Sequence, residues 1–219
     1  MSLHIVHFEI LGQKHWGIID RDNIIHILPK CYKTTAALLI DKNIIINFSV
    51  DEIAQLTKVE FTEVKILSPV IGNKRVICQG ANYRQHMIES GMNPDKQNYN
   101  MFFNKSSAAI CSAQEHIIKP KHVCLLDYEI ELGLVMGSVI NKQTDINHEN
   151  ICDYIGAIVI GNDVSAREVQ ISQTQFFKGK SYRTFCPVGP YLCLIDETNI
   201  DKLTQLNLEL KVNGEIRQK

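Results

Sequence analysis

Short apolar runs, each of strand length and separated by turn residues, restrict the fold of this chain more than any other feature. The segments 3–8, 16–19 and 24–28 are rich in isoleucine and aromatic residues. Gly12 and the polar run 20–23 lie between them. Apolar runs bounded by such residues predict β-strands joined by tight turns.

The rest of the chain adds short helices and further strands. Helices are expected at 34–39 and 50–56, and the pair Ser68–Pro69 then marks a boundary because proline interrupts both regular structures. We therefore expect a small N-terminal domain at 1–69 and a second domain at 70–219. In that domain we predict a buried strand at 75–78, a turn at 80–83 with a helix from Arg84, a central strand at 128–136, a helix at 147–155 capped by Asn147, and a buried strand at 157–160. The predicted fold class is mixed α+β, mostly β.

Composition excludes several classes of partner. Of the 219 residues, 45% are hydrophobic and the net charge is -1, so electrostatics predict neither nucleic acid nor an anionic membrane as a partner. No apolar run approaches the ~20 residues of a membrane span, and the first residues lack a signal peptide's features, so we expect a cytoplasmic protein. The seven cysteines include no C-x-x-C pair, which predicts buried, reduced thiols.

The last segment predicts an incomplete hairpin. Leucine and valine alternate with polar residues over 206–212, as in a half-buried strand, and Asn213–Gly214 is a strong hairpin signal. Only 215–219 remain to form the return strand. Because exposed strand edges pair readily with another chain, we expect the chain to be at least dimeric.

Two glutamates in the predicted central strand indicate a cation site. Glu129 and Glu131 are two residues apart, so on a strand their side chains point to the same face. Neighbouring carboxylates among apolar residues repel each other and are poorly solvated, and a bound cation would relieve both problems. The alternatives are an exposed face of an edge strand, or one carboxylate that stays protonated.

A third acid follows the predicted strand at 157–160. Asp163 stands directly after this strand, where a rigid element meets a loop, a common place for functional residues. Arg167 and Gln170 follow at intervals of about one helical turn and could line the same pocket. The alternative is that Asp163 only caps the next helix.

A histidine and a glutamate form a candidate catalytic pair. His86 and Glu89 are three residues apart in a predicted helix and share one face. A carboxylate can orient an imidazole and raise its basicity, which suits a general base acting on water. On spacing alone, a solvated surface pair is the simpler interpretation.

In combination, these motifs resemble the fumarylacetoacetate hydrolase family from about residue 77 to the end. The matching residues occur in the family's order and spacing. They are Gly80-x-Asn82-Tyr83-x-x-His86-x-x-Glu89, Phe103-x-Lys105, Asp127-Tyr128-Glu129-x-Glu131-Leu132, Gly161-Asn162-Asp163-Val164-Ser165-Ala166-Arg167-x-x-Gln170 and Gly179-Lys180-Ser181.

The resemblance implies a metal-dependent catalytic domain. It implies a β-roll that follows a small variable N-terminal domain and binds Mg²⁺ or Mn²⁺ through Glu129, Glu131 and Asp163. Ligands that are all oxygen favour such hard cations independently. The family acts on small 2-oxo acids, typically acylpyruvates, and often forms homodimers.

The reaction expected from the resemblance is hydrolysis of a C–C bond in a 2,4-dioxo acid. The implied roles are catalysis by His86, Glu89, Gln170 and Lys180, and substrate binding by Tyr83 and Arg167. Three alternatives remain open. The first is a 2-oxo acid decarboxylase or tautomerase on the same metal site, and the second is a non-catalytic truncated family member. The third is a solvated surface with no site.

The sequence departs from the family at two places. Arg183 stands where members of the acylpyruvase group commonly carry an acid. Family domains also continue beyond the hairpin with further strands and a Thr-Gly-Thr-Pro-like loop that contacts substrate, and the 219 residues contain neither. We therefore expect this form to be truncated and to be a weak or inactive catalyst.

Overall fold

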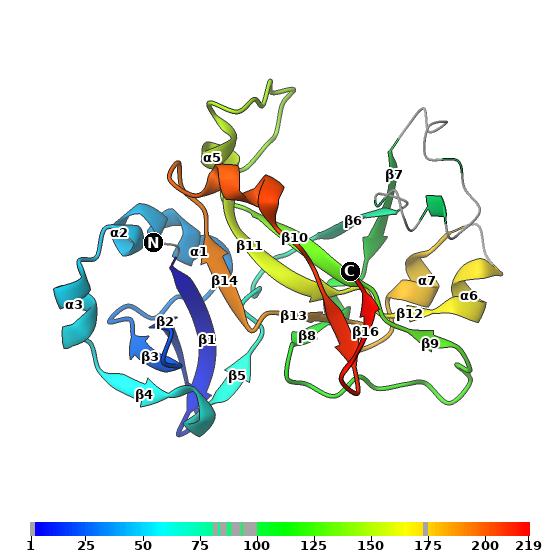
Figure 1. Ribbon diagram of the computed structural model, residues 1–219, viewed down its shortest axis with the longest axis horizontal. Helices are drawn as coiled ribbons and strands as arrows, with labels where there is room; N and C mark the ends of the chain where they lie inside the picture. Colours follow the sequence, from blue (N-terminus) through cyan, green and yellow to red (C-terminus); the bar gives the residue numbers. More distant parts are fainter. Residues whose placement is uncertain (1–2, 81–82, 84–86, 89–92, 94–99, 173–174) are drawn as a thin grey trace.

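A computed structural model describes residues 3–80, 83, 87–88, 93, 100–172 and 175–219. In this part of the chain the largest element is a ten-stranded sheet in which β4, β3, β2, β1, β14, β11, β13 and β8 follow one another, β10 pairs with β11 and β5 pairs with β1 (Figure 1). Its strands are β1 His4–Ile10, β2 Gln13–Ile19, β3 Ile24–Ile27, β4 Lys58–Glu60, β5 Lys65–Leu67, β8 Ile110–Ser112, β10 Ile130–Met136, β11 Ile155–Asn162, β13 Cys186–Val188 and β14 Tyr191–Leu194. The fold is therefore mostly β, as predicted.

Smaller elements surround this sheet. Strands β6 Val76–Gly80 and β7 Met101–Lys105, β9 Leu126–Asp127 and β12 Ser165–Ala166, and β15 Leu210–Val212 and β16 Glu215–Gln218 form two-stranded sheets. The helices are α1 Thr35–Ile40, α2 Lys42–Ile46, α3 Val50–Gln55, α5 Ile151–Tyr154, α6 Arg167–Ile171 and α7 Phe177–Lys180, with 3₁₀ turns η1 Phe61–Glu63, η2 Ser107–Ala109 and η3 Ile200–Gln205. None of these helices, within the described residues, is long and apolar enough to cross a membrane.

The first strands form the meander that the sequence predicts. β1 and β2 pair antiparallel along their full length, and the turn between them places Leu11 and Gly12 at positive φ. Two consecutive residues of positive φ suit the twist of a two-residue hairpin. Helices α1 and α3 lie where they are expected, and Ser49 caps α3 in a reciprocal bond with Glu52.

The N-terminal strands continue into the same sheet as the rest of the chain. β1 pairs with β14 through His4–Cys193, Ile5–Leu192 and Val6–Tyr191. One core cluster contains both N-terminal residues, such as Ile5 and Trp16, and later ones, such as Leu192. The division at residue 69 stays a prediction, but the strands on its two sides share hydrogen bonds and a core.

Several predicted elements are shorter than expected. The helix expected at 147–155 covers only α5, and its N-cap is Asn150 instead of the predicted Asn147, whose carbonyl accepts from Asn150 and Ile151 in a preceding turn. The strand expected at 206–212 is only β15, since η3 extends to Gln205. Gly80, expected in a turn, ends strand β6 opposite Met101.

The C-terminal hairpin forms and is attached to β10. Asn213 and Gly214 both have positive φ, which confirms the predicted turn. The side-chain amide of Gln218 accepts from the N–H of Ile130 at 2.8 Å and donates to the carbonyl of Tyr128 at 3.2 Å. These two bonds imitate a strand pair and hold the segment that carries Glu129.

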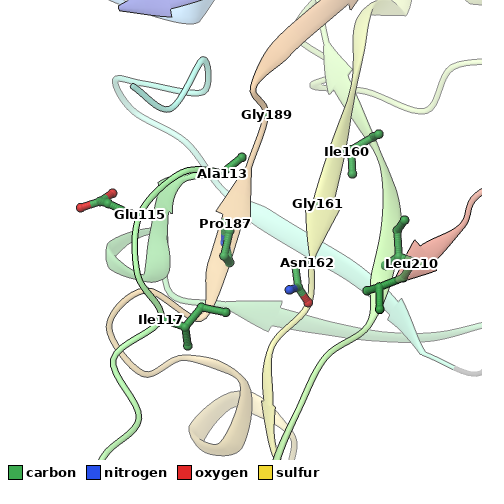
Figure 2. A pocket seen from close by; sticks show the side chains of 10 residues that line it. Ala113, Glu115, Ile117, Ile160, Gly161, Asn162, Pro187, Gly189 and Leu210 are labelled. Carbon is green, nitrogen blue, oxygen red and sulfur yellow. The ribbon is translucent and has the colours of Figure 1, made fainter. Parts of the chain in front are cut away.

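An apolar pocket lies between this hairpin and the sheet. Side chains from β11, β13 and the loop at 113–117 line it, together with Leu210 (Figure 2). Ile160 is 50% exposed there, and Ile216 of the hairpin is 53% exposed. The dimer predicted from the hairpin stays a prediction.

The cysteines are all free thiols, as predicted. Cys111 and Cys186 are buried, whereas Cys31 and Cys124 are exposed, so the expectation that the thiols are buried is wrong for these last two.

Candidate active site

The predicted acidic residues meet at one end of the β10–β11 pair. Glu131 in β10 lies opposite Gly161 in β11. Glu129 precedes β10, and its backbone accepts from the N–H of Asp163 at 2.8 Å and donates to the Asn162 side chain at 3.1 Å. These bonds bring Glu129 and Asp163, 34 positions apart in the chain, to adjacent places.

Two buried lysines pair with Asp163 and Glu129 at this acidic end. Nζ of Lys180 lies 2.6 Å from Oδ2 of Asp163 and 2.8 Å from Oε2 of Glu129. Lys105 pairs with the other oxygen of Asp163 and donates to the carbonyl of Val164 at 3.2 Å. The side chains of Lys105 and Lys180 are only 1% and 2% exposed, and buried charges require such partners.

Among the three predicted acids, Glu131 is the one with no lysine ion pair in the described part of the chain. Burial, together with the negative charges of Asp163 and Glu129, raises the pKa of Glu131 to about 7 against the opposing effect of Lys180. The Tyr83 hydroxyl forms a hydrogen bond with Glu131, and burial, with the charge of Glu131, raises the pKa of this tyrosine. The structure thus places the predicted substrate-binding Tyr83 against a predicted metal ligand.

Arg167 links the acids to Gln170, to which the resemblance gives a catalytic role. Its guanidinium contacts Asp127 through Nε at 2.7 Å, Glu129 through Nη2 at 2.6 Å, and Gln170 through Nη1 at 2.9 Å. Helix α7 packs closely on α6 because Gly179 has no Cβ: one added there would lie 2.8 Å from the backbone nitrogen of Gln170. This close approach allows Lys180 at the end of α7 to reach the carboxylates.

The donor set fits a divalent cation. Four carboxylates (Asp127, Glu129, Glu131 and Asp163) meet three cationic side chains (Lys105, Lys180 and Arg167), and the formal charge is -1 when every carboxylate is ionised. All the anionic donors are oxygen atoms, which Mg²⁺ and Mn²⁺ prefer. In the part of the chain that the structure describes, no three acidic, histidine or cysteine side chains form a ready-made ligand group. The ammonium of Lys180 instead bridges Glu129 and Asp163. The assignment of ligands therefore stays a prediction.

The structure adds residues to those predicted from sequence. Lys105 belongs to a motif that the resemblance matched but received no role, and it is bonded directly to Asp163. Ser165 donates to Glu129 at 3.2 Å. Phe103 lies beneath the Lys180 ammonium, 5.4 Å from the ring centre. The motif Phe103-x-Lys105, which belongs to the resemblance, is the signal that could have identified Lys105. His86 and Glu89 lie outside the described residues.

The raised pKa of Glu131 predicts a stability difference that depends on pH. The pKa of Glu131 is about 7 in the folded state, above the ordinary 4.5, so the protonated side chain contributes its full stabilisation below pH 4.5. This stabilisation is lost as the pH rises through 7. In EDTA, the wild type should therefore lose free energy of unfolding relative to Glu131→Gln over this window. Urea denaturation at a series of pH values measures the difference, and parallel curves for the two proteins would contradict the burial of Glu131. Because metal and proton compete for the carboxylate, Mn²⁺ affinity should rise over the same window.

Comparisons with known proteins identify the family of this chain. The model of the fumarylacetoacetate (FAA) hydrolase C-terminal family matches residues 75–219. Oxaloacetate tautomerase YisK of Bacillus subtilis is 38% identical over 159 residues, which are 72% of this chain and 51% of that protein. A 2,4-didehydro-3-deoxy-L-rhamnonate hydrolase of Sphingomonas is 32% identical over 208 residues, which are 93% of this chain and 67% of that protein. The chain thus spans about half the length of several curated relatives it matches.

Solved structures share the fold. A fumarylacetoacetate hydrolase from Exiguobacterium antarcticum, 27% identical, superimposes with a TM-score of 0.76 over 99% of this chain and 74% of that one. A maleylpyruvate hydrolase from Sphingobium, solved with manganese(II) and pyruvate, has a TM-score of 0.70 at 19% identity over 100% of this chain and 75% of that one. On the family match, the chain belongs to the fumarylacetoacetate hydrolase family.

Proposed function

We propose that this chain forms the metal-binding part of an enzyme that hydrolyses a C–C bond in a small 2,4-dioxo acid. The observation that carries the proposal is the cluster of Glu129, Glu131 and Asp163 beside two buried lysines. A site of this kind can accept one divalent cation and one anionic substrate. The cation would change the formal charge of the site from -1 to +1, and a monoanionic substrate would then bring it to zero. The Sphingomonas hydrolase, similar over 93% of this chain, supports a hydrolytic reaction.

The proposed metal ligands are Glu129, Glu131 and Asp163, and the proposed cation is Mg²⁺ or Mn²⁺. When bound, such an ion would orient the carboxylate and 2-oxo oxygens of the substrate and stabilise negative charge on them. Around it, Lys105 would hold Asp163 in place through their ion pair. Tyr83 would hold Glu131 in the same way through its hydroxyl.

The chain's own residues would perform the remaining steps. His86, oriented by Glu89, would remove a proton from a water molecule, and the hydroxide would attack the distal carbonyl carbon. Lys180 and Gln170 would donate hydrogen bonds to the oxyanion formed there. Cleavage of the C–C bond would then release an acid and the enolate of pyruvate, which takes up a proton.

A tautomerase is the second candidate. The relative from Bacillus subtilis and one from Rattus norvegicus, 33% identical over 166 residues, are both oxaloacetate tautomerases. Such a reaction would use the same carboxylates and lysines to stabilise an enolate but would need no activated water. The two candidates therefore differ in what they require of His86.

Replacing His86 with alanine separates these candidates. We expect acylpyruvate hydrolysis to fall by roughly 10²-fold or more, because the water loses its general base. Mn²⁺ binding, measured by calorimetry, should stay unchanged, since the ligands are intact. Replacement of His148, which is exposed and pairs with Asp201, is the matched control and should leave turnover unchanged. Undiminished hydrolysis by His86→Ala would overturn the hydrolytic mechanism, and retained oxaloacetate tautomerisation would support the second candidate.

A further inference from the structure

All three nitrogens of the Arg167 guanidinium contact protein oxygens. Nε faces Asp127, Nη2 faces Glu129 and Nη1 faces Gln170, at distances from 2.6 to 2.9 Å. The side chain is 22% exposed. Three of the five N–H donors that could otherwise bind a substrate carboxylate are thus directed at protein oxygens within the site.

The contact with Arg167 determines how the Gln170 amide is turned. Arginine carries donors and no acceptor, so the group that faces Nη1 must be the amide oxygen of Gln170. The amide nitrogen is then directed away from Arg167. Without this contact the two ends of the amide would be nearly equivalent, and Gln170 could present either a donor or an acceptor to a reacting oxygen.

Asp127 holds Arg167 in this orientation. Its Oδ2 accepts from Nε of Arg167, while its Oδ1 accepts from the N–H of Tyr128 at 2.9 Å. The two backbones are also joined, since Asp127 pairs with Ser165 and the N–H of Arg167 donates to Leu125 at 2.9 Å. The carboxylate therefore has a fixed position from which it can orient the guanidinium.

We propose that Asp127 is a positioning residue: through Arg167, it fixes Oε1 of the metal-ligand candidate Glu129 and turns the Gln170 amide so that its nitrogen serves as a donor. This inference rests on the proposed function, and it assigns Arg167 to the support of the site rather than to the substrate. One carboxylate would thus set both the cation site and the oxyanion site.

Asp127→Asn tests the proposal on the full chain. The variant keeps the shape of the side chain but removes its charge, so Arg167 should lose its fixed orientation. We expect Mn²⁺ affinity to fall about tenfold, the scale seen when residues behind metal ligands are replaced. In ¹H–¹⁵N spectra, the Gln170 side-chain amide, identified by its absence from Gln170→Glu, should become more mobile. Arg167→Lys, a second variant, should reproduce both effects.

Asp41→Asn is the matched control. Asp41 also accepts two side-chain bonds, from Lys30 and Tyr32, but it lies in the N-terminal part of the fold. Asp41→Asn should leave both the Mn²⁺ affinity and the mobility of the Gln170 amide unchanged. If Asp127→Asn keeps both readouts within twofold of the wild type, or changes them only as much as Asp41→Asn does, the positioning role is overturned.

The readouts separate this inference from the proposed function. A wild type that binds Mn²⁺ but turns over no 2-oxo acid would contradict the proposed reaction, while the Mn²⁺ and amide measurements would still decide the role of Asp127. If the wild type bound no Mn²⁺, the mobility of the Gln170 amide alone would decide it. A Gln170 amide already mobile in the wild type would overturn the inference.

Discussion

Replacing Asp163 with alanine is expected to lower the free energy of unfolding by about 3–5 kcal/mol, the usual cost of removing one partner from a buried ion pair. Asp163 accepts from Lys105 and Lys180, whose side chains are 1% and 2% exposed. Without the carboxylate, Lys105 loses its only charged partner among the described residues and Lys180 keeps only Glu129. Chemical denaturation in EDTA measures the loss.

A second substitution distinguishes uncompensated charge from lost packing. Asp163→Ala combined with Lys105→Met should recover part of the stability, because the double variant no longer buries that unpaired ammonium. Asp201→Ala is the control. The Asp201 side chain is 71% exposed and pairs with His148, so its removal should lower the free energy of unfolding by at most about 1 kcal/mol. An Asp163→Ala loss as small as that of the control would mean that water reaches the lysines.

The largest effect on activity is expected from Glu131→Ala. We expect turnover to fall by at least about 10³-fold, because a bound cation supplies several kcal/mol of charge stabilisation to such reactions. The rise in melting temperature on addition of Mn²⁺ should also disappear. In EDTA, however, the variant should be at least as stable as the wild type above pH 7, because it no longer buries the Glu131 charge, whose pKa is raised to about 7.

Loss of turnover and of the Mn²⁺ effect, with stability retained in EDTA, distinguishes a metal ligand from a residue that only supports the fold. Glu215→Ala, which removes a carboxylate that is 70% exposed and pairs with Arg217, should keep both turnover and the Mn²⁺ effect. If Glu131→Ala kept a wild-type response to Mn²⁺, Glu131 would not be a ligand. If it lost stability in EDTA above pH 7, its loss of activity would be explained by misfolding instead.

Local patterns were sufficient to predict the first strands and the last hairpin. The meander of β1, β2 and β3 and the hairpin at Asn213–Gly214 follow from short-range apolar runs and turn residues, and both form as predicted. Their signals lie within a few residues of one another, so no distant contact is needed to read them. Boundaries at α5 and β15 differ because a neighbouring turn and a 3₁₀ segment take up backbone groups that the sequence pattern leaves open.

The acids and lysines of the site were partly visible in the sequence as well. The spacing of Glu129 and Glu131, with the resemblance, named the acidic residues and Lys180. The family match over 75–219 confirms the family from which those roles were taken. These motifs follow one another along the chain in the family's order and spacing, so they could be recognised without knowing which side chains touch.

Only the tertiary structure decided how these charges are paired. Lys105 and Asp163 are separated by 58 positions, yet their side chains are bonded, and Asp127 meets Arg167 across 40 positions. Partner choice in a buried charge cluster depends on distances of a few ångströms and on exclusion of water, and neither is encoded in local spacing. The sequence by itself determined which chemical groups are present, and the packing of β10, β11, α6 and α7 determined which of them meet, because desolvated charges are stable only where the fold brings opposite charges into contact.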